Sequence, residues 1–452
     1  MSGIWIPDQQ DKDHLARAED ALADGRLDDV LHCLMDGFRR AQAASSNAVP
    51  LPVGWPEADA VVARIARRFE RPEMRGPCEG GPDVFVATRL YAVGGHTAVL
   101  DDYFRASEAS RKRILLSGMA GEASLTPALR ARLGPTAEAV EICPVPGLAD
   151  TTAWLSQRLG QLCPRRIFLF HHPEDAPAVA AVAAFGAEKC HLVHHADSTP
   201  CVGLHVPGLR LIDLAPFPAW VSRQVLGLEN LYLPLAVDDP GPPPVRRPND
   251  RLRTCTHGSA VKFADHGPCA FASTVARVLA ATGGDHLHIG PLDDDRRNSL
   301  RRALEAAGVS PDRFTHIKHV TSLVPALREF GLDVSLGSFP VGGARGHIDM
   351  MSMGIPHLTY LDNPSHAPWK LHLLAPGACH WSTQDGLVKL LAEASPEWLA
   401  AQSALMRRHF LLHHDARQFR SRLAALDDVA ALPSVPPMPA STRASWAAAL
   451  AR

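Results

Sequence analysis

The spacing of hydrophobic positions changes near residue 83. Between residues 12 and 46, apolar residues recur every three or four positions in two runs separated by Gly25. This is the period of amphipathic helices, and residues 57–70 repeat it. A glycine- and proline-rich stretch over 75–82 then interrupts the pattern. We therefore expect a helical accessory segment over residues 1–80.

From residue 83 onward, short apolar runs alternate with helical stretches. Strands that alternate with helices form a parallel sheet covered on both faces, so we expect an N-terminal Rossmann-like domain over 81–237. The predicted strands of this domain are 83–90, 113–119, 139–145, 165–172, 189–197 and 209–216, with helices at 98–106, 151–162 and 175–186.

Residues 238–250 are rich in proline and predict a linker to a second α/β series. We expect a C-terminal Rossmann-like domain over 250–430 and a tail over 431–452. Ligands of such sheets bind at the carboxyl ends of the strands, so the fold class expected is α/β with two Rossmann-like domains facing a cleft. The predicted strands are 252–259, 286–292, 314–320 and 333–336, and the helices are 268–282, 295–307 and 321–329.

Composition agrees with two large domains, because 452 residues exceed what one ordinary core supports. The hydrophobic fraction of 46% and the charged fraction of 21% are those of soluble globular proteins. The formal net charge of −2 argues against a nucleic-acid partner or an anionic membrane surface.

Cysteine usage and the N-terminus predict a cytoplasmic protein. The nine cysteines are odd in number and form no Cys-x-x-Cys pair, so we expect reduced thiols. The N-terminus lacks the basic region and apolar run of a signal peptide. No apolar stretch approaches the ~20 residues that span a bilayer, which predicts no integral membrane segment. The oligomeric state stays open.

The segment from Asp333 to Tyr360 predicts strand, glycine-rich loop, helix and strand in turn. Gly342, Gly343 and Gly346 are expected to form the loop, where only backbone would approach a ligand. A helix start behind glycines offers N–H groups and a positive dipole end, which suits a diphosphate. Asp349, expected in the first turn of the helix, can accept hydrogen bonds from ribose hydroxyls. The pattern predicts a nucleotide-sugar site.

This segment resembles the donor site of GT-B glycosyltransferases, nearest to the O-linked N-acetylglucosamine transferases and the bacterial adhesin glycosyltransferases. The resemblance covers roughly residues 230–425 and departs from those families at Arg345-Gly346-His347, where relatives carry small hydroxyl residues. It rests on Phe339-Pro340, the loop 342–347, Asp349 and Gly354-Ile355-Pro356.

The resemblance implies roles for these residues and for two others. The loop with Gly343, Arg345, Gly346 and His347 would contact the diphosphate, and Asp349 would hold the ribose. Lys262, which follows the strand 252–259, matches a lysine that approaches the diphosphate, where an ammonium group stabilises the leaving charge. His316 matches by position a strand that contacts the base. The alternatives from the residues alone are a solvated Lys262 and a helix cap by Thr321 or Ser322.

In the first domain, histidines follow predicted strand ends. Gly94 and Gly95 open a helix at His96, and could contact the donor. His171-His172 and His194-His195 end two strands, the second followed by Asp197. We expect the base that assists the acceptor to be His96, His195 or Asp197. The alternatives are a helix cap by His96, a His/Asp metal site, or structural hydrogen bonding.

Together these patterns favour a metal-independent glycosyltransferase that uses a nucleotide-diphosphate sugar and no separate cofactor. The resemblance implies a UDP-sugar, hexosyl or heptosyl, and a protein or glycan acceptor. A sugar-nucleotide epimerase of the same fold, a non-catalytic scaffold and a metal-dependent hydrolase remain alternatives. Near the C-terminus, His413-His414-Asp415 is expected to cap a helix with its histidines facing solvent.

Overall fold

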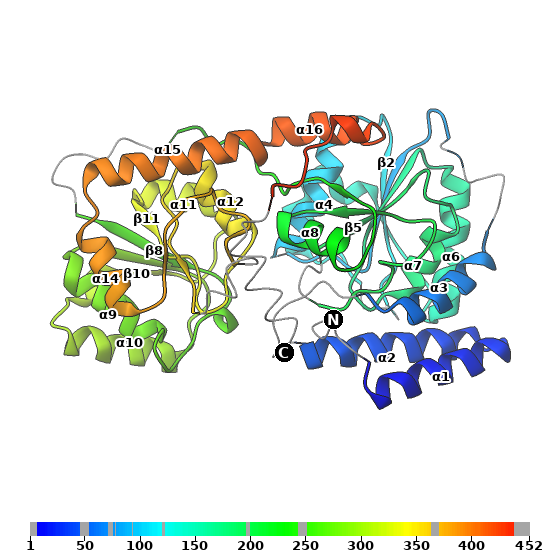
Figure 1. Cartoon of the computed structure of the whole chain (residues 1–452), viewed down its shortest axis with the longest axis horizontal. Helices are drawn as coiled ribbons and strands as arrows, with labels where there is room; N and C mark the ends of the chain where they lie inside the picture. The colour runs from blue at the N-terminus through cyan, green and yellow to red at the C-terminus, as the bar shows by residue number, and fades with distance from the viewer. Residues whose placement is uncertain are drawn as a thin grey trace. The chain divides into compact units, whose positions relative to one another are not determined.

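The computed structural model describes residues 7–45, 54–70, 76, 78–92, 94–119, 123–195, 199–242, 251–362 and 370–437. Within it the chain divides into two units, each built around its own parallel sheet (Figure 1). The first unit contains the described residues up to Pro234 and those from Arg420 to 437. The second contains those from Leu235 to Phe419.

The first unit holds a seven-stranded sheet in the order β3-β2-β1-β4-β5-β6-β7, and all its strand pairs are parallel. The six strands predicted for this domain are confirmed. The edge strand β7 was not predicted, because three residues carry no readable alternation. The strands are β1 (Asp83–Ala87), β2 (Lys112–Leu116), β3 (Val140–Ile142), β4 (Arg166–Phe170), β5 (Cys190–His194), β6 (Arg210–Asp213) and β7 (Asn230–Tyr232).

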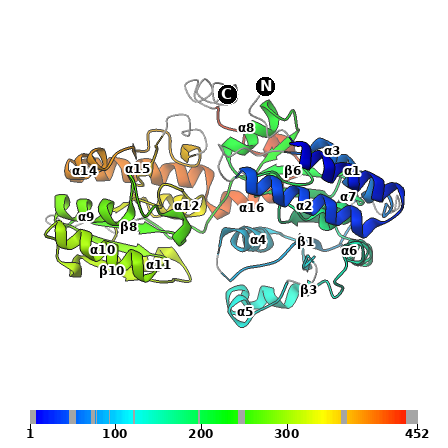
Figure 2. The ribbon, with the colours of Figure 1, turned by 90° about the horizontal axis from the view of Figure 1, so that it is seen from below.

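Helices cover this sheet, and the N-terminal helices join its core. Val61, Leu159 and Val179 come from an N-terminal helix and two sheet-covering helices, yet belong to one buried cluster. The three N-terminal helices lie together beside α6 and α7 (Figure 2). The helices are α1 (Gln9–Ala23), α2 (Leu27–Ser45), α3 (Pro56–Arg67), α4 (Gly95–Ala106), α5 (Pro127–Leu133), α6 (Leu148–Leu162), α7 (Ala176–Ala183) and α8 (Pro216–Gln224), with α16 (Ala416–Ala424) entering from the second unit.

The second unit holds a four-stranded parallel sheet in the order β10-β9-β8-β11 and a two-stranded pair, β12-β13. Its predicted strands and helices are confirmed. The strands are β8 (Arg253–His257), β9 (Asp285–Ile289), β10 (Phe314–Ile317), β11 (Val334–Ser335), β12 (Thr359–Tyr360) and β13 (His380–Trp381). The helices are α9 (Phe271–Thr282), α10 (Asp294–Ala306), α11 (Leu323–Phe330), α12 (Arg345–Ser352), α14 (Gln384–Ala392) and α15 (Pro396–His413).

Two sequence-based expectations are wrong. Cys78 and Cys163 form a disulfide, so the cysteines are not all reduced thiols. His414 is buried rather than solvent-facing, and its Nδ1 donates to the carbonyl oxygen of Leu235 at 2.6 Å. Among the described residues, no helix combines the length and apolar character needed to cross a membrane.

Candidate functional site

Lys262 faces the glycine loop in the second unit. After β8 the chain turns at Gly258, where φ is +148°, and a short 3-10 helix (Ala260–Lys262) follows. Phe263 then pairs with Pro340 in an antiparallel bridge. A Cβ built on Gly343 would lie 3.3 Å from Nζ of Lys262. The fold therefore brings together two positions that are 81 residues apart in the sequence and that were both predicted to contact a diphosphate.

The glycine loop leads into α12, which begins at Arg345. Gly346 therefore lies inside the helix and not in the loop, which corrects the expectation from sequence. A Cβ on Gly346 would approach Cε1 of His257 to 2.4 Å, so glycine permits α12 to pack closely against the end of β8. Ala344 occupies the N-cap position and makes no side-chain capping bond. The N–H groups at the start of α12 therefore have no hydrogen bond to an N-cap side chain.

Asp349 is the fifth residue of α12, one turn further from the helix start than expected. Its side chain is half-buried, and its carbonyl oxygen accepts a hydrogen bond from Oγ of Ser352 at 2.7 Å. Helix-dipole stabilisation falls off within the first turn. A carboxylate at this position is therefore poorly placed to act only as a stabiliser of the helix start.

His347 lies in the interior and not on the loop surface. Its ring is 4.3 Å from that of His357, centroid to centroid, and both rings are buried. Burial lowers the pKa of His347 well below its usual value, and that of His357 to about 3. These rings are therefore neutral and serve packing beneath the loop. Contact of His347 with a diphosphate through its backbone stays a prediction.

Arg345 and His316 take different positions around the loop. Arg345 directs Nη1 toward the carbonyl oxygen of Ala236 at 3.5 Å. His316, on β10, donates from Nε2 to the carbonyl oxygen of Gly290 at 2.8 Å. Gly290 packs against Gly258 at the carboxyl ends of β9 and β8, where a Cβ on Gly290 would meet the Gly258 carbonyl oxygen at 2.1 Å. His316 therefore lies near the carboxyl edge of the sheet, and its contact with a base stays a prediction.

In the first unit, the structure brings His96 and His195 together. Gly94, with φ of +122°, precedes α4, and His96 is the second residue of that helix. Its Nε2 donates to the carbonyl oxygen of Phe170 at 3.0 Å, so His96 does not cap α4. The His96 and His195 rings lie 4.4 Å apart between centroids. Asp197 lies outside the described residues.

Two further side chains, Tyr91 and His172, join this group of rings. The hydroxyl of Tyr91 lies 2.9 Å from Nε2 of His172, whose ring is 5.7 Å from that of His96. Burial lowers the pKa of His96 and of His195, and it lowers that of His172 to about 3. The histidines are neutral near pH 7, which is the form that can accept a proton. The double histidine at the end of β4 was a sequence signal for His172, whereas Tyr91 carried none.

A buried pair at the neighbouring strand ends was also missed. Nδ1 of His194 lies 2.8 Å from Oδ1 of Asp213, and Asn230 donates to the same carboxylate. Both members of the pair are fully buried, which favours a role in the fold. Within the described part of the chain, no three His, Cys, Asp or Glu side chains are grouped to hold a metal ion.

Comparison with known proteins assigns the fold. No family model matches the sequence, and no curated protein matches it. The structure of Anabaena HepE in complex with UDP and glucose matches with a TM-score of 0.54 at 12% identity, covering 77% of this chain and 99% of that one. A Rickettsia africae glycosyltransferase matches with a TM-score of 0.54 at 8% identity, covering 77% and 99%.

The lipopolysaccharide outer core galactosyltransferase WaaB matches with a TM-score of 0.51 at 12% identity, covering 76% of this chain and 99% of that one. At such identities the likeness carries the fold alone. The chain is an α/β protein with the parallel sheets of GT-B glycosyltransferases.

Proposed function

We propose that the protein is a glycosyltransferase that moves a sugar from a UDP-sugar to a hydroxyl or amide acceptor on a protein or glycan. The observation that carries this proposal is the position of Lys262, whose Nζ lies against Gly343 at the loop that opens α12. An ammonium group and the N–H groups of a helix start converge there, and both complement a diphosphate. The matched structures add support, since HepE was solved with UDP and glucose.

In the proposed reaction the acceptor atom attacks the anomeric carbon while the bond from that carbon to the diphosphate oxygen breaks. The electron pair of the broken bond stays on the diphosphate, so negative charge develops beside Lys262 and the start of α12. Fixed positive groups at that place lower the barrier without needing a metal ion. Asp349 accepts hydrogen bonds from the ribose hydroxyls.

The acceptor must lose a proton as it attacks, and we assign this role to the histidines of the first unit. Burial lowers the pKa of His96 and of His195, so each is in the neutral form that a general base requires. The side chains of His96 and His195 are both only half-buried, and His96 lies at the start of α4. Asp197 remains the third candidate.

A thermal-shift titration tests the donor site. UDP at millimolar concentration should raise the melting temperature in the presence of EDTA, because a ligand that binds only the folded protein stabilises it by mass action. CDP, GDP and ADP show whether the base is discriminated, and UMP shows what the second phosphate contributes. If none of the nucleoside diphosphates shifts the melting temperature, the donor-site assignment is wrong.

A further inference from the structure

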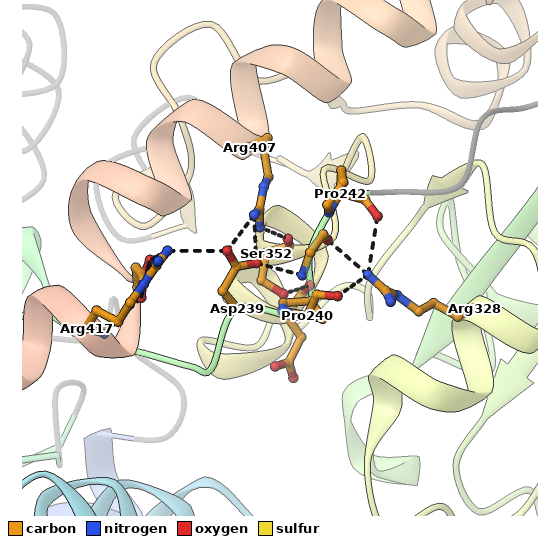
Figure 3. Close-up of polar contacts among 10 residues, drawn as sticks. Asp239, Pro240, Pro242, Arg328, Ser352, Arg407 and Arg417 are labelled. Atoms are coloured by element: carbon orange, nitrogen blue, oxygen red, sulfur yellow. Dashed lines mark hydrogen bonds and ion pairs between the residues drawn. The ribbon is translucent and has the colours of Figure 1, made fainter.

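Residues 235–242, which lead from the first unit into the second, are held by side chains from two helices of the second unit (Figure 3). Arg328, on α11, donates to the carbonyl oxygens of Gly241 and Pro242 at 2.9 and 3.3 Å, and also to that of Pro240. Arg407, on α15, contacts the Asp239 carboxylate at 2.6 Å. Both side chains therefore fix the same segment, from different helices.

Arg407 differs from Arg328 because it also holds α12. Its Nη1 donates to the carbonyl oxygen of Ser352, the last residue of α12, while its Nη2 binds Asp239 (Figure 3). The Arg407 side chain is 17% exposed and that of Asp239 is 21% exposed, so water screens the pair only in part. One guanidinium group thus connects the C-terminal end of α12 to the linking segment.

The helix α12 needs outside support. It has eight residues, whereas isolated helices shorter than ~12–15 residues are marginal in water. It includes Gly346, and its N-cap makes no side-chain bond. A cation at the last carbonyl groups stabilises a helix by satisfying an acceptor and by complementing the dipole. Arg407 supplies that cation, and Asp239 fixes its orientation.

We propose that Arg407, oriented by Asp239, is a positioning residue for the nucleotide site: it holds the C-terminal end of α12 and thereby sets the place of Asp349 and of the loop before the helix. The expected effect on nucleotide binding rests on the proposed function, whereas the support of α12 by Arg407 does not. Arg407 is not expected to touch the donor, so its role is separate from those of Lys262 and Asp349.

The test compares Arg407→Met with Arg328→Met in the full-length protein. Two quantities are measured: UDP affinity by titration calorimetry, and hydrogen exchange of the amides of residues 345–352 without nucleotide. Arg407→Met should weaken UDP binding about tenfold and speed exchange in α12. Arg328→Met removes a different attachment of the linking segment, and should keep both quantities within twofold of the wild type. Arg407→Lys keeps the charge but not the fork, and should restore part of the affinity.

The possible results distinguish a failure of the inference about Arg407 from a failure of the proposed function. If Arg407→Met leaves exchange in α12 unchanged, the inference is wrong whatever the nucleotide does. If Arg328→Met changes both quantities as much as Arg407→Met does, a general loosening of the segment is responsible and the inference is again wrong. If the wild type binds no nucleoside diphosphate but exchange follows the expected pattern, the support of α12 by Arg407 stands and the proposed function fails.

Discussion

At the scale of single residues, Lys262 has the most direct role in the proposed reaction. Replacing Lys262 with methionine keeps most of the side-chain volume and removes the charge beside Gly343. We expect the transfer rate to fall ~10²–10³-fold, the magnitude typical of losing one group that stabilises developing negative charge. Initial rates of UDP release at saturating donor measure this. Lys389→Met, at an exposed position on α14, is the matched control and should leave the rate unchanged.

Asp349 permits a second test of the donor site. Asp349→Asn keeps the shape but removes the charge, and charge-assisted hydrogen bonds contribute ~1.5–3 kcal/mol each. We therefore expect UDP affinity to fall at least tenfold by calorimetry, with a small change in melting temperature. Affinity for inorganic pyrophosphate, which has no ribose, should be unaffected. Unchanged UDP affinity with a lowered melting temperature would show that Asp349 serves only its helix.

At the scale of elements, the sheet of the second unit buries a row of neutral histidines. His286 shares hydrogen bonds with Thr254 at 2.8 Å and with Thr256 at 3.0 Å, and Thr256 also contacts His288 at 2.9 Å. Burial lowers the pKa of His286 and of His288 to about 3. These interactions join β8 to β9 below the candidate site.

This row predicts the pH dependence of stability. The unfolded histidines titrate near pH 6.5 and the folded ones near 3, so only the unfolded chain binds protons between these values. The stabilisation is complete above about pH 6.5 and declines as the pH falls through that window. Each group contributes a slope of at most ~1.4 kcal/mol per pH unit to the free energy of unfolding.

Urea denaturation between pH 7.5 and pH 5 checks this for one group. The His286→Gln variant should be less stable at pH 7.5. As the pH falls, its free energy of unfolding should decrease less steeply than that of the wild type, and the difference in slope should correspond to about one proton taken up on unfolding. The same substitution at the exposed His319 is the matched control, because this histidine lies outside the buried row. Equal slopes in the wild type and His286→Gln would contradict the prediction.

Elements with strong local patterns could be predicted from the sequence, and long-range contacts could not. The strands β1 and β4 are continuous apolar runs, and α12 follows glycines and precedes Gly354 and Pro356. The start of α12 was misplaced because Gly346 suggested a loop, whereas its close contact with His257 is visible only in the fold. Asp239 and Arg407 are 168 residues apart, and local sequence carries no signal for such a pair.

At the scale of the whole molecule, the proposed function divides its parts between the two units. The donor residues Lys262 and Asp349 belong to the second unit, and the candidate bases His96 and His195 belong to the first. Binding of a nucleotide and removal of the acceptor proton should then respond separately to substitution. This separation can be measured even though the acceptor is unidentified, because UDP affinity requires no acceptor.

We expect His96→Ala to lower transfer ~10²–10⁴-fold, the range for losing a general base, while UDP affinity stays within about twofold of the wild type. His195→Ala and Asp197→Ala are the parallel tests, and rates of sugar transfer to acceptors in a cell lysate provide the measurement. His319→Ala, at an exposed position in the second unit, is the control.

If all three variants keep normal transfer, the base lies elsewhere. If a variant loses UDP affinity together with transfer, a residue of the first unit contributes to nucleotide binding. The assignment of nucleotide binding to the second unit alone is then wrong.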